Sequence, residues 1–382
     1  MFLRRLHLRS FRNYVDRQIE FTARKTILVG NNAQGKSNLL EAVELLASLK
    51  SHRTIRDREF VLDTATAGQI EATLERAYGT SELSIIFRKQ GKRTVALNRE
   101  SLRRQLDFLG VLNAVQFSSL DLDLVRGAPD TRRNWIDGLL IQLEPIYASI
   151  LQEYNQILRQ RNALLKKMRA IRQDESTGFI DAYEPQLRLW DKQLAAAGSR
   201  IARRRARVIA RLAPLAQSWH QRISGETERL EINYLPNVEW TEDEPIRVQQ
   251  AFLAKIELRR VAEQFQGKTV VGTHRDEIDF IINQTPARYY GSQGQQRTLV
   301  LALKLAELKL IEEVIGEPPL LLLDDVLAEL DPNRQKQLLA AIGDRFQTMI
   351  TTTHIDSFNY DWIKGSQILS VEAGKISEVL LN

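Results

Sequence analysis

Alternating apolar and polar positions dominate roughly the first hundred residues of the chain. A period of two is typical of half-buried strands, and Gly79-Thr80 and Gln90-Gly91 are turn signals between the later ones. The predicted strands are residues 6–10, 15–21, 26–29, 69–78, 83–88 and 93–97, followed by an apolar run at 111–117. We therefore expect antiparallel β-structure in the first third of the chain.

Helical spacing of apolar residues replaces this alternation over residues 130–222. A polar segment at 173–178 interrupts the spacing and suits the turn of a helical hairpin. The elements predicted next are a strand at 230–234 and a helix at 246–264. The expected organisation is a helical lid or arm domain, 126–264, inserted into a domain made of residues 1–125 and 265–382.

Strands alternate with helices again in the last third of the chain, a pattern that predicts a parallel sheet. The predicted strands are residues 268–272, 278–282, 320–323 and 347–352, with a final hairpin of 367–372 and 375–380. The predicted helices are residues 295–315 and 332–342. Ligands of such sheets bind at the carboxyl ends of the strands, so residues that follow a strand are the candidates for chemistry.

The composition indicates the cellular compartment in which the chain folds. The chain has 382 residues and no cysteine, which excludes disulfides and thiolate metal ligands and is typical of a reducing cytosol. Its first residues alternate apolar and charged side chains, and no run of about 18 apolar residues occurs. We therefore expect a soluble, cytoplasmic protein without a membrane partner.

Arginines are unevenly distributed. The net charge of +6 permits a polyanionic partner without requiring one. Four arginines share one helical face at i, i+4, i+7 and i+11, and we call them the arginine stripe: Arg200, Arg204, Arg207 and Arg211. Arg203 and Arg205 lie among them. A solvated outer face and a contact surface for a phosphate backbone both remain open for this stripe.

A phosphate-loop motif lies between a predicted buried strand and a predicted helix. Its sequence matches G-x-x-x-x-G-K-[ST], in which backbone N–H groups surround phosphates, the lysine meets their oxygens and the serine hydroxyl joins Mg²⁺. The helix that follows presents its N-terminus to the anion. The motif residues, which we expect to bind ATP or GTP, are Gly30, Asn31, Asn32, Ala33, Gln34, Gly35, Lys36 and Ser37.

Two carboxylates follow the predicted buried strand at 320–323. Asp324 is placed to hold Mg²⁺ together with Ser37, and Asp325 to orient or deprotonate the attacking water. An acidic turn after a core strand would be the simpler interpretation if the phosphate loop were absent.

A second candidate for anion binding is residues 292–296, at the start of a predicted helix. Ser292 supplies a hydroxyl, Gly294 permits close approach of backbone, and the helix N-terminus favours negative charge. Read alone, the segment is an ordinary capped helix start. Because Lys36 already serves one face of the γ-phosphate, we expect the segment to complete the nucleotide site of a second copy of the chain.

Taken together, these residues resemble the ABC-type ATPases of the SMC kind, and among them the members that act in DNA repair. The resemblance covers nearly the whole chain. Besides the motifs above, it is carried by Leu8 to Tyr14, Leu124 to Pro129 with Arg132-Arg133, Gly272 to Asp276, and Leu323 to Asp331. The fold it implies is an α/β ABC-type ATPase head, with a phosphate-loop core and an antiparallel β subdomain, interrupted by a short helical lid or arm.

The resemblance also implies roles for individual residues. Lys36 and Ser37 match the Walker A motif, and Asp324 matches the Walker B aspartate. Gln116 matches the Q-loop, which implies a role toward metal and water. Ser292, Gly294 and Gln295 match the signature motif, and Asp331 matches the D-loop. His354 follows the next strand, where many of these ATPases have a switch histidine that contacts the γ-phosphate. Many of them have Glu at the position of Asp325, so slow hydrolysis is expected.

The function that the resemblance implies is an ATP-gated DNA clamp for recombinational repair and maintenance of replication forks, including the SOS response. ATP with Mg²⁺ would close a head-to-tail homodimer on double-stranded or gapped DNA. Weak, DNA-stimulated hydrolysis would reopen the dimer. RecO and RecR are implied as partners in loading RecA. In this setting the arginine stripe and Arg132-Arg133 are candidates for contact with the DNA backbone.

Two other classes of protein share parts of the pattern. A small-molecule NTPase or kinase would have the phosphate loop but would leave Ser292 to Gln296 unexplained. An ATPase subunit of a membrane transporter would share the nucleotide site, but the helical insertion between Gln116 and Ser292 favours DNA. His274, beside Arg275 and Asp276, has no paired ligand spacing, so we expect it to have a structural role.

Overall fold

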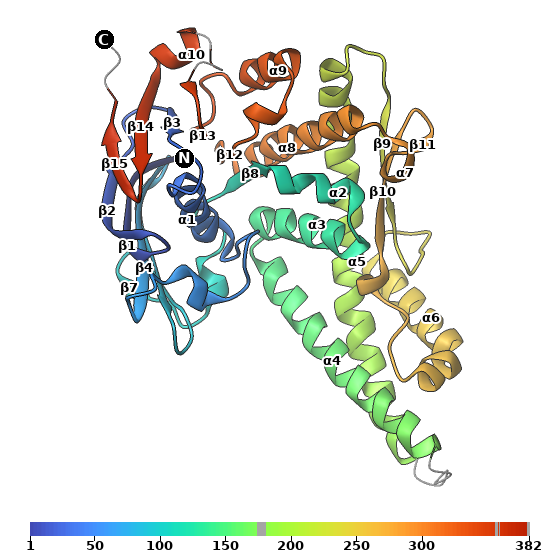
Figure 1. Ribbon diagram of the computed structural model, residues 1–382. Helices are drawn as coiled ribbons and strands as arrows, with labels where there is room; N and C mark the ends of the chain where they lie inside the picture. Colours follow the sequence, from blue (N-terminus) through green and yellow to red (C-terminus); the bar gives the residue numbers. More distant parts are fainter. Residues whose placement is uncertain (174–180, 356–357, 359, 380–382) are drawn as a thin grey trace.

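The computed structural model describes residues 1–173, 181–355, 358 and 360–379. It contains two six-stranded sheets, a three-stranded sheet and a long helical projection (Figure 1). The expected α/β fold with an antiparallel subdomain and an inserted helical arm is confirmed.

The first six-stranded sheet is mainly parallel and carries the phosphate loop. Its strand order is β15-β14-β3-β13-β12-β8, with β15 antiparallel at one edge. The strands are β3 (Lys25–Val29), β8 (Ala114–Ser118), β12 (Leu320–Asp324), β13 (Thr348–Thr352), β14 (Ser366–Glu372) and β15 (Lys375–Glu378). Since β3, β12 and β13 are neighbours in the parallel register, the residues that follow them meet at one edge of the sheet.

The second six-stranded sheet is antiparallel and has the order β2-β1-β4-β5-β6-β7. Its strands are β1 (Phe2–Phe11), β2 (Tyr14–Glu20), β4 (Ala67–Arg76), β5 (Gly79–Arg88), β6 (Thr94–Leu97) and β7 (Glu100–Ser101). Helix α1 (Lys36–Ser48) contacts β8, β12 and β13 of the parallel sheet and β5 of the antiparallel sheet. This helix therefore joins the two sheets.

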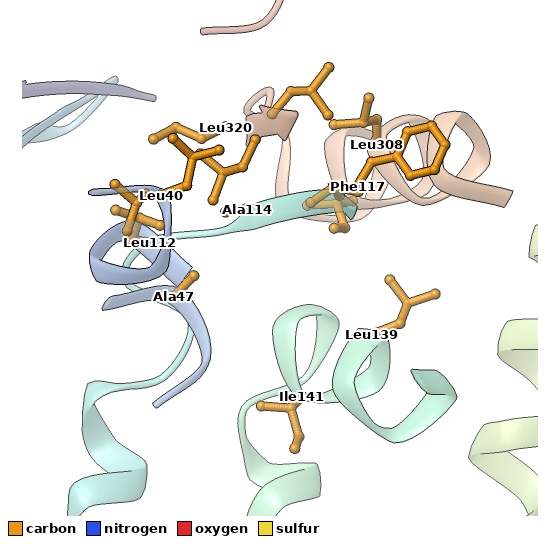
Figure 2. Packing of buried hydrophobic residues seen from close by; sticks show 14 of the residues in the cluster. Leu40, Ala47, Leu112, Ala114, Phe117, Leu139, Ile141, Leu308 and Leu320 are labelled. Atoms are coloured by element: carbon orange, nitrogen blue, oxygen red, sulfur yellow. The ribbon is translucent and has the colours of Figure 1, made fainter. Parts of the chain in front are cut away.

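Buried apolar side chains fill the space around α1 and β8. Figure 2 shows Leu40 and Ala47 of α1 beside Leu112, which precedes β8, and Ala114, the first residue of β8. Phe117 of β8 lies on the side of Leu308, which belongs to α8 (Gln293–Ile315). The nucleotide loop is thus built on elements whose other faces are locked into the core.

The helical projection extends away from both sheets (Figure 1). Its helices are α4 (Ile146–Gln173), α5 (Glu184–Ile223) and α6 (Pro245–Gln266), preceded by α3 (Pro129–Leu143). The α4 and α5 helices pack against each other as the predicted hairpin requires. The polar connection predicted at 173–178 lies outside the described residues apart from Gln173, the last residue of α4.

The third sheet, β11-β10-β9, joins the arm region to the head. Strand β9 (Leu230–Leu235) pairs with β10 (Glu277–Ile282), and α5 packs along α8. The predicted division at residues 264/265 therefore separates two strands of one sheet. The remaining strand and short helices are β11 (Thr285–Pro286), α2 (Asp123–Arg126), α7 (Ala287–Tyr290), α9 (Pro332–Ile342) and α10 (Tyr360–Lys364).

The strand predicted at 268–272 is wrong, because side chains replace the expected strand ladder. The Thr269 amide donates to Asn162 Oδ1 at 2.7 Å, and the amides of Val270 and Val271 donate to Glu263 Oε1 at 2.7 and 3.2 Å. With its N–H groups satisfied in this way, the segment needs no strand partner. Gly272 then turns the chain at φ 136°.

The base of the arm is held by a buried ionic cluster around Arg205. This side chain is 3% exposed and pairs with Asp137 and Asp276, each at 2.9 Å. Burial opposes the charge of Arg205, but the neighbouring Asp137 outweighs that cost and raises its pKa. Removing one partner from such a cluster would leave an uncompensated buried charge. Arg205 is therefore a structural residue, unlike the exposed arginines near it in sequence.

Arg132 is also structural, so the expectation that it contacts DNA is wrong. It is 3% exposed and makes a two-pronged pair with Glu277, at 2.7 and 2.8 Å. Arg133 donates to the backbone oxygen of Asp276 at 2.8 Å. Both arginines thus fasten α3 to the segment that begins β10.

His274 has the structural role expected from the sequence. Its Nδ1 accepts from the Tyr154 hydroxyl at 2.8 Å, and its Nε2 lies 3.3 Å from the Thr269 carbonyl oxygen. Both contacts are satisfied by a neutral ring. Burial lowers the pKa of His274 to about 4, and Arg275 and Arg133 add to this effect.

The neutral state of His274 predicts a pH dependence of stability. Its folded pKa of about 4 lies below the ordinary value of 6.5, so the unfolded chain binds the proton first as pH falls. Stability is therefore present above pH 6.5 and lost between 6.5 and 4. Chemical unfolding at pH 7 and pH 5 should show about 1–2 kcal/mol less loss in His274→Gln than in the original chain. An equal loss in both would contradict a neutral buried ring.

Candidate nucleotide-binding site

The phosphate loop runs between β3 and α1, as the motif predicts. Gly35 has φ 118°, and a Cβ there would lie 2.6 Å from Asn13 Nδ2. At Gly30, a Cβ would lie 2.3 Å from the backbone oxygen of Val371 in β14. Glycine is required at both positions, since other parts of the chain close tightly around the loop.

Lys36 begins α1 with its side chain folded back across the loop. Its ammonium group donates to the backbone oxygens of Gly30 and Asn31, at 2.8 and 3.0 Å. The side chain is 4% exposed, so it is held in place by the loop. This is the position from which a lysine can meet phosphate oxygens lying over the N-terminus of α1.

Ser37 and Asp324 meet across the carboxyl ends of the strands. The Ser37 hydroxyl donates to Asp324 Oδ1 at 2.8 Å, and the same oxygen accepts from the Thr351 hydroxyl at 2.8 Å. The structure thus brings together Ser37 and Asp324, which the sequence analysis paired although they are 287 residues apart. A hydroxyl and a carboxylate are hard oxygen donors that suit Mg²⁺ bound with phosphates, so the residues fit this metal.

Asp325 follows Asp324 in a left-handed backbone conformation, φ 54°. This conformation is strained for a residue other than glycine. It is held in place because the Asp325 amide donates a 2.8 Å hydrogen bond to the Thr351 hydroxyl. Burial raises the pKa of Asp325, Lys36 opposes this, and Asp324 adds to it. Held strain and a raised carboxyl pKa are both common at catalytic positions.

A cavity of about 290 Å³ opens over the loop. Its lining includes Arg53, which the sequence analysis did not identify; the others are Asn32, Ala33, Gln34, Gly35, Lys36, Ser37, Asn38 and Asp325. Arg53 donates to Asn38 Oδ1 at 2.7 Å and to Glu41 Oε2 at 3.4 Å. A second cation therefore borders the phosphate site from outside the motif.

Two glutamates of α1, the buried Glu41 and the half-buried Glu44, fix the segment that carries Arg53. Glu41 accepts from the Ser51 hydroxyl at 2.5 Å, and Glu44 accepts from the His52 amide at 3.1 Å and from its ring at 2.8 Å. The spacing of two carboxylates at i, i+3 within the apolar run Leu39 to Ala47 was the available signal in the sequence.

Gln116 also belongs to this cluster. In the amide orientation that satisfies both neighbours, it donates to Glu44 at 3.0 Å and accepts from His52 Nδ1 at 3.0 Å. Burial of the ring lowers the pKa of His52, but the hydrogen bond and charge of Glu44 outweigh this and raise it. In β8 Gln116 is paired with Leu322, two residues before Asp324. Its role toward metal or water stays a prediction.

Ser292 is the N-cap of α8, as its simpler interpretation predicts. Its hydroxyl accepts from the Gln295 amide at 3.2 Å, while the Gln295 side chain accepts from the Ser292 amide at 2.8 Å. This reciprocal capping box leaves Ser292 and Gln293 exposed. Among the described residues, those that line the phosphate cavity include none from 292–296.

Asp331 caps α9 and is tied to α8. Its carboxylate accepts from the amides of Asn333 and Arg334, each at 3.1 Å, and hydrogen bonding from Arg334 lowers its pKa. Arg334 also donates to Thr298 of α8 at 2.8 Å, and a Cβ on Gly294 would lie 3.3 Å from its guanidinium. Arg334 therefore joins Asp331, the N-cap of α9, to α8, the helix that begins with the predicted signature segment.

His354 follows β13 at the carboxyl edge of the parallel sheet. Its backbone amide donates to the Thr352 hydroxyl at 3.2 Å, which in turn donates to the His354 backbone oxygen at 2.9 Å. Its switch role stays a prediction. Within the part of the chain that the structure describes, no group of three His, Cys, Asp or Glu residues could hold a metal, and no helix has the length and apolarity to cross a membrane.

Comparison with known proteins shows which family the chain belongs to. The model of the RecF/RecN/SMC N-terminal domain family matches residues 2–372. The DNA replication and repair protein RecF of Gloeothece citriformis (strain PCC 7424) is 70% identical over 383 residues, spanning 99% of this chain and 100% of that protein. RecF of Synechocystis sp. (strain ATCC 27184 / PCC 6803 / Kazusa) is 63% identical over 380 residues, spanning 99% and 98%.

Solved structures agree with the sequence relatives. The recombination mediator protein RecF with ATP, in the RecFOR pathway, has a TM-score of 0.89 and 31% identity, covering 99% of this chain and 98% of that one. The Smc head domain of Pyrococcus furiosus, bound to the C-terminal domain of ScpA, has a TM-score of 0.54 at 15% identity and shows the shared head fold alone. The chain therefore belongs to the RecF family of SMC-like ABC ATPases.

Proposed function

We propose that the chain is an ATP-dependent DNA-binding protein of replication and recombinational repair. The observation that carries the proposal is the phosphate loop, where Lys36 lies across the loop and Ser37 meets Asp324. We infer that these residues form one half of a nucleotide site and that the exposed N-terminus of α8 at Ser292 supplies the other half from a second copy. Relatives that are 70% identical are DNA replication and repair proteins, and a structural relative is described with ATP.

In the first half-site, this chain's own residues bind and orient the nucleotide. Lys36 and the amides at the start of α1 would hold the phosphates, and Arg53 would add charge at the edge of the cavity. Ser37 and Asp324 would hold Mg²⁺, which when bound neutralises charge on the phosphates. Asp325 would accept the proton of the attacking water.

The second half-site would act on another copy. Ser292 and the exposed N-terminus of α8 offer a hydroxyl and backbone amides to an anion, which is the requirement at a γ-phosphate. A head-to-tail homodimer would use both half-sites twice, since each copy supplies one of each. ATP would close the dimer on double-stranded or gapped DNA, and slow, DNA-stimulated hydrolysis would reopen it.

The partners follow from the same proposal. A relative described as a recombination mediator in the RecFOR pathway supports joint action with RecO and RecR, with RecA as the protein finally loaded. The helical arm, which extends beyond the head, would lengthen the surface available to DNA (Figure 1).

Sedimentation of the protein with labelled duplex DNA tests the proposal. With ATP and Mg²⁺, the protein should form a dimer that sediments together with the DNA. When either ATP or Mg²⁺ is omitted, the protein should stay monomeric and the DNA should remain free. A protein that binds ATP yet stays monomeric and ignores DNA would instead fit a small-molecule NTPase or kinase.

The arginine stripe gives a narrower prediction. Arg204 and Arg207 are paired with Glu144 and Asp243, at 2.9 and 2.7 Å, and together with Arg211 they line a surface groove between α3, α5 and α8. Exposed pairs of this kind are weak, so a phosphate can replace the carboxylate.

If the groove contacts DNA, Arg207→Ala with Arg211→Ala should weaken ATP-dependent DNA binding for every sequence. The slope of log affinity against log salt should fall by about 2, since each lost phosphate contact removes about 0.9. The control pair Lys92→Ala with Arg103→Ala removes the same charge from exposed positions on the head. Equal slopes in the two double variants would remove the stripe from the DNA-contact surface.

A further inference from the structure

Two exposed tyrosines immediately precede the cap of α8. Tyr289 and Tyr290, at the end of α7, are 71% and 73% exposed, and their rings meet edge to face at 6.3 Å. The Arg288 guanidinium lies 5.4 Å from the centre of the Tyr289 ring. Tyrosine and arginine are, with tryptophan, the side chains enriched at the energetic centres of protein interfaces. This aromatic pair borders Ser292 within the same short segment.

A second exposed apolar side chain lies close in sequence to a residue that lines the phosphate cavity. Ile55 is 93% exposed and lies two residues after Arg53, which lines the phosphate cavity. The segment before it is fixed to α1, because Glu41 and Glu44 hold Ser51 and His52. Ile55 is therefore presented to solvent from a loop whose preceding residues are anchored to α1, two residues beyond the cavity-lining Arg53.

We propose that, in the ATP-bound dimer on which the proposed function rests, Tyr289 and Tyr290 of each copy pack against Ile55 of the other. The partner on this surface is thus a second copy of the chain. Placing the Ser292 cap over the partner's phosphates brings the residues just before the cap toward the rim of the partner's cavity, which is lined by Arg53, two residues before Ile55. Each contact occurs twice by symmetry.

The proposed contact adds an apolar, water-excluding area to a dimer interface that the half-sites alone would hold by polar contacts. Phosphate contacts alone give a wet interface held by charge, whereas two tyrosine rings against an isoleucine exclude water around it. Tyrosine also loses little side-chain entropy when it is ordered, since only two torsions are fixed. A single exposed aromatic residue needs no explanation, and Tyr78, 94% exposed beside the β4–β5 turn, is one. The adjacent pair beside a half-site is different.

Cysteine crosslinking tests the contact directly, because the chain has no cysteine of its own. Two singly substituted proteins, Tyr290→Cys and Ile55→Cys, are mixed and treated with a short bismaleimide. With ATP and Mg²⁺ the mixed pair should give crosslinked dimer at ten or more times the yield without ATP. The control mixture, Tyr78→Cys with Ile55→Cys, should stay at background in both conditions.

A second measurement covers the energetics. Tyr289→Ser with Tyr290→Ser should raise the dimer dissociation constant in saturating ATP at least tenfold, whereas Tyr78→Ser should leave it as in the original chain. Thermal unfolding and ATP binding, followed in the same samples, separate this effect from loss of the fold.

The outcomes divide cleanly. If ATP drives dimerisation but the crosslink stays at the control level and the double serine variant associates normally, the tyrosine contact is overturned and the proposed dimer stands. If the original chain remains monomeric with ATP, both the dimer and the contact are wrong.

Discussion

Asp325→Asn is expected to slow ATP hydrolysis by about 10²–10⁴-fold while leaving ATP binding largely intact. Asparagine keeps the size of the side chain but cannot accept a proton. The position is otherwise fixed, since the Asp325 amide is held by Thr351 and the carboxylate lines the phosphate cavity. Phosphate release under excess ATP measures turnover, and calorimetric titration measures binding.

The control for this prediction is Asp344→Asn. Asp344 has an 83% exposed side chain and pairs with Lys25, so the same chemical change is made away from the phosphate cavity. Turnover in that variant should match the original chain. If Asp325→Asn hydrolyses ATP at the original rate, another group accepts the proton and the assignment is wrong. An additional consequence of the assignment is that the blocked variant should stay longer as an ATP-bound dimer on DNA.

The geometry around the phosphate loop was predictable because each of its parts is specified locally. The glycines of the loop, the lysine and the serine lie within eight consecutive residues, and a strand and a helix flank them. Asp324 follows a short run of leucines that predicts a buried strand, and parallel pairing of that strand with β13 and of β13 with β3 places Asp324 beside Ser37. The capping box at Ser292 was predictable for the same reason.

Errors arose where distant side chains decide the local structure. Residues 268–272 have the apolar character of a strand, but Glu263 and Asn162 bind their amides. Arg132 has no local feature that distinguishes it from an exposed arginine, and its burial depends on Glu277. Arg53 was missed because its place at the phosphate cavity is set by Glu41, a residue of α1. Such pairings are tertiary, and sequence periodicity carries no record of them.

Ser292→Arg is expected to abolish ATP-driven dimerisation and DNA retention together, while ATP still binds to the monomer. The guanidinium would occupy the space that a partner's γ-phosphate needs beside the N-terminus of α8, and it places a cation at the positive end of the helix. Loss of the serine N-cap lowers the stability of the fold by only about 1 kcal/mol, so it does not account for the expected loss of dimerisation. Sedimentation with and without ATP, on duplex DNA, measures both losses.

Ser101→Arg is the matched control, because Ser101 is exposed on the short strand β7 of the antiparallel sheet and receives the same change in size and charge. It should dimerise and retain DNA like the original chain. Ser292 lies outside the residues that line the phosphate cavity of its own copy, so an intact ATP affinity in Ser292→Arg locates the damage in the partner's site. If instead Ser292→Arg lost ATP binding as a monomer, the segment would serve its own nucleotide, and the head-to-tail arrangement would have to be abandoned.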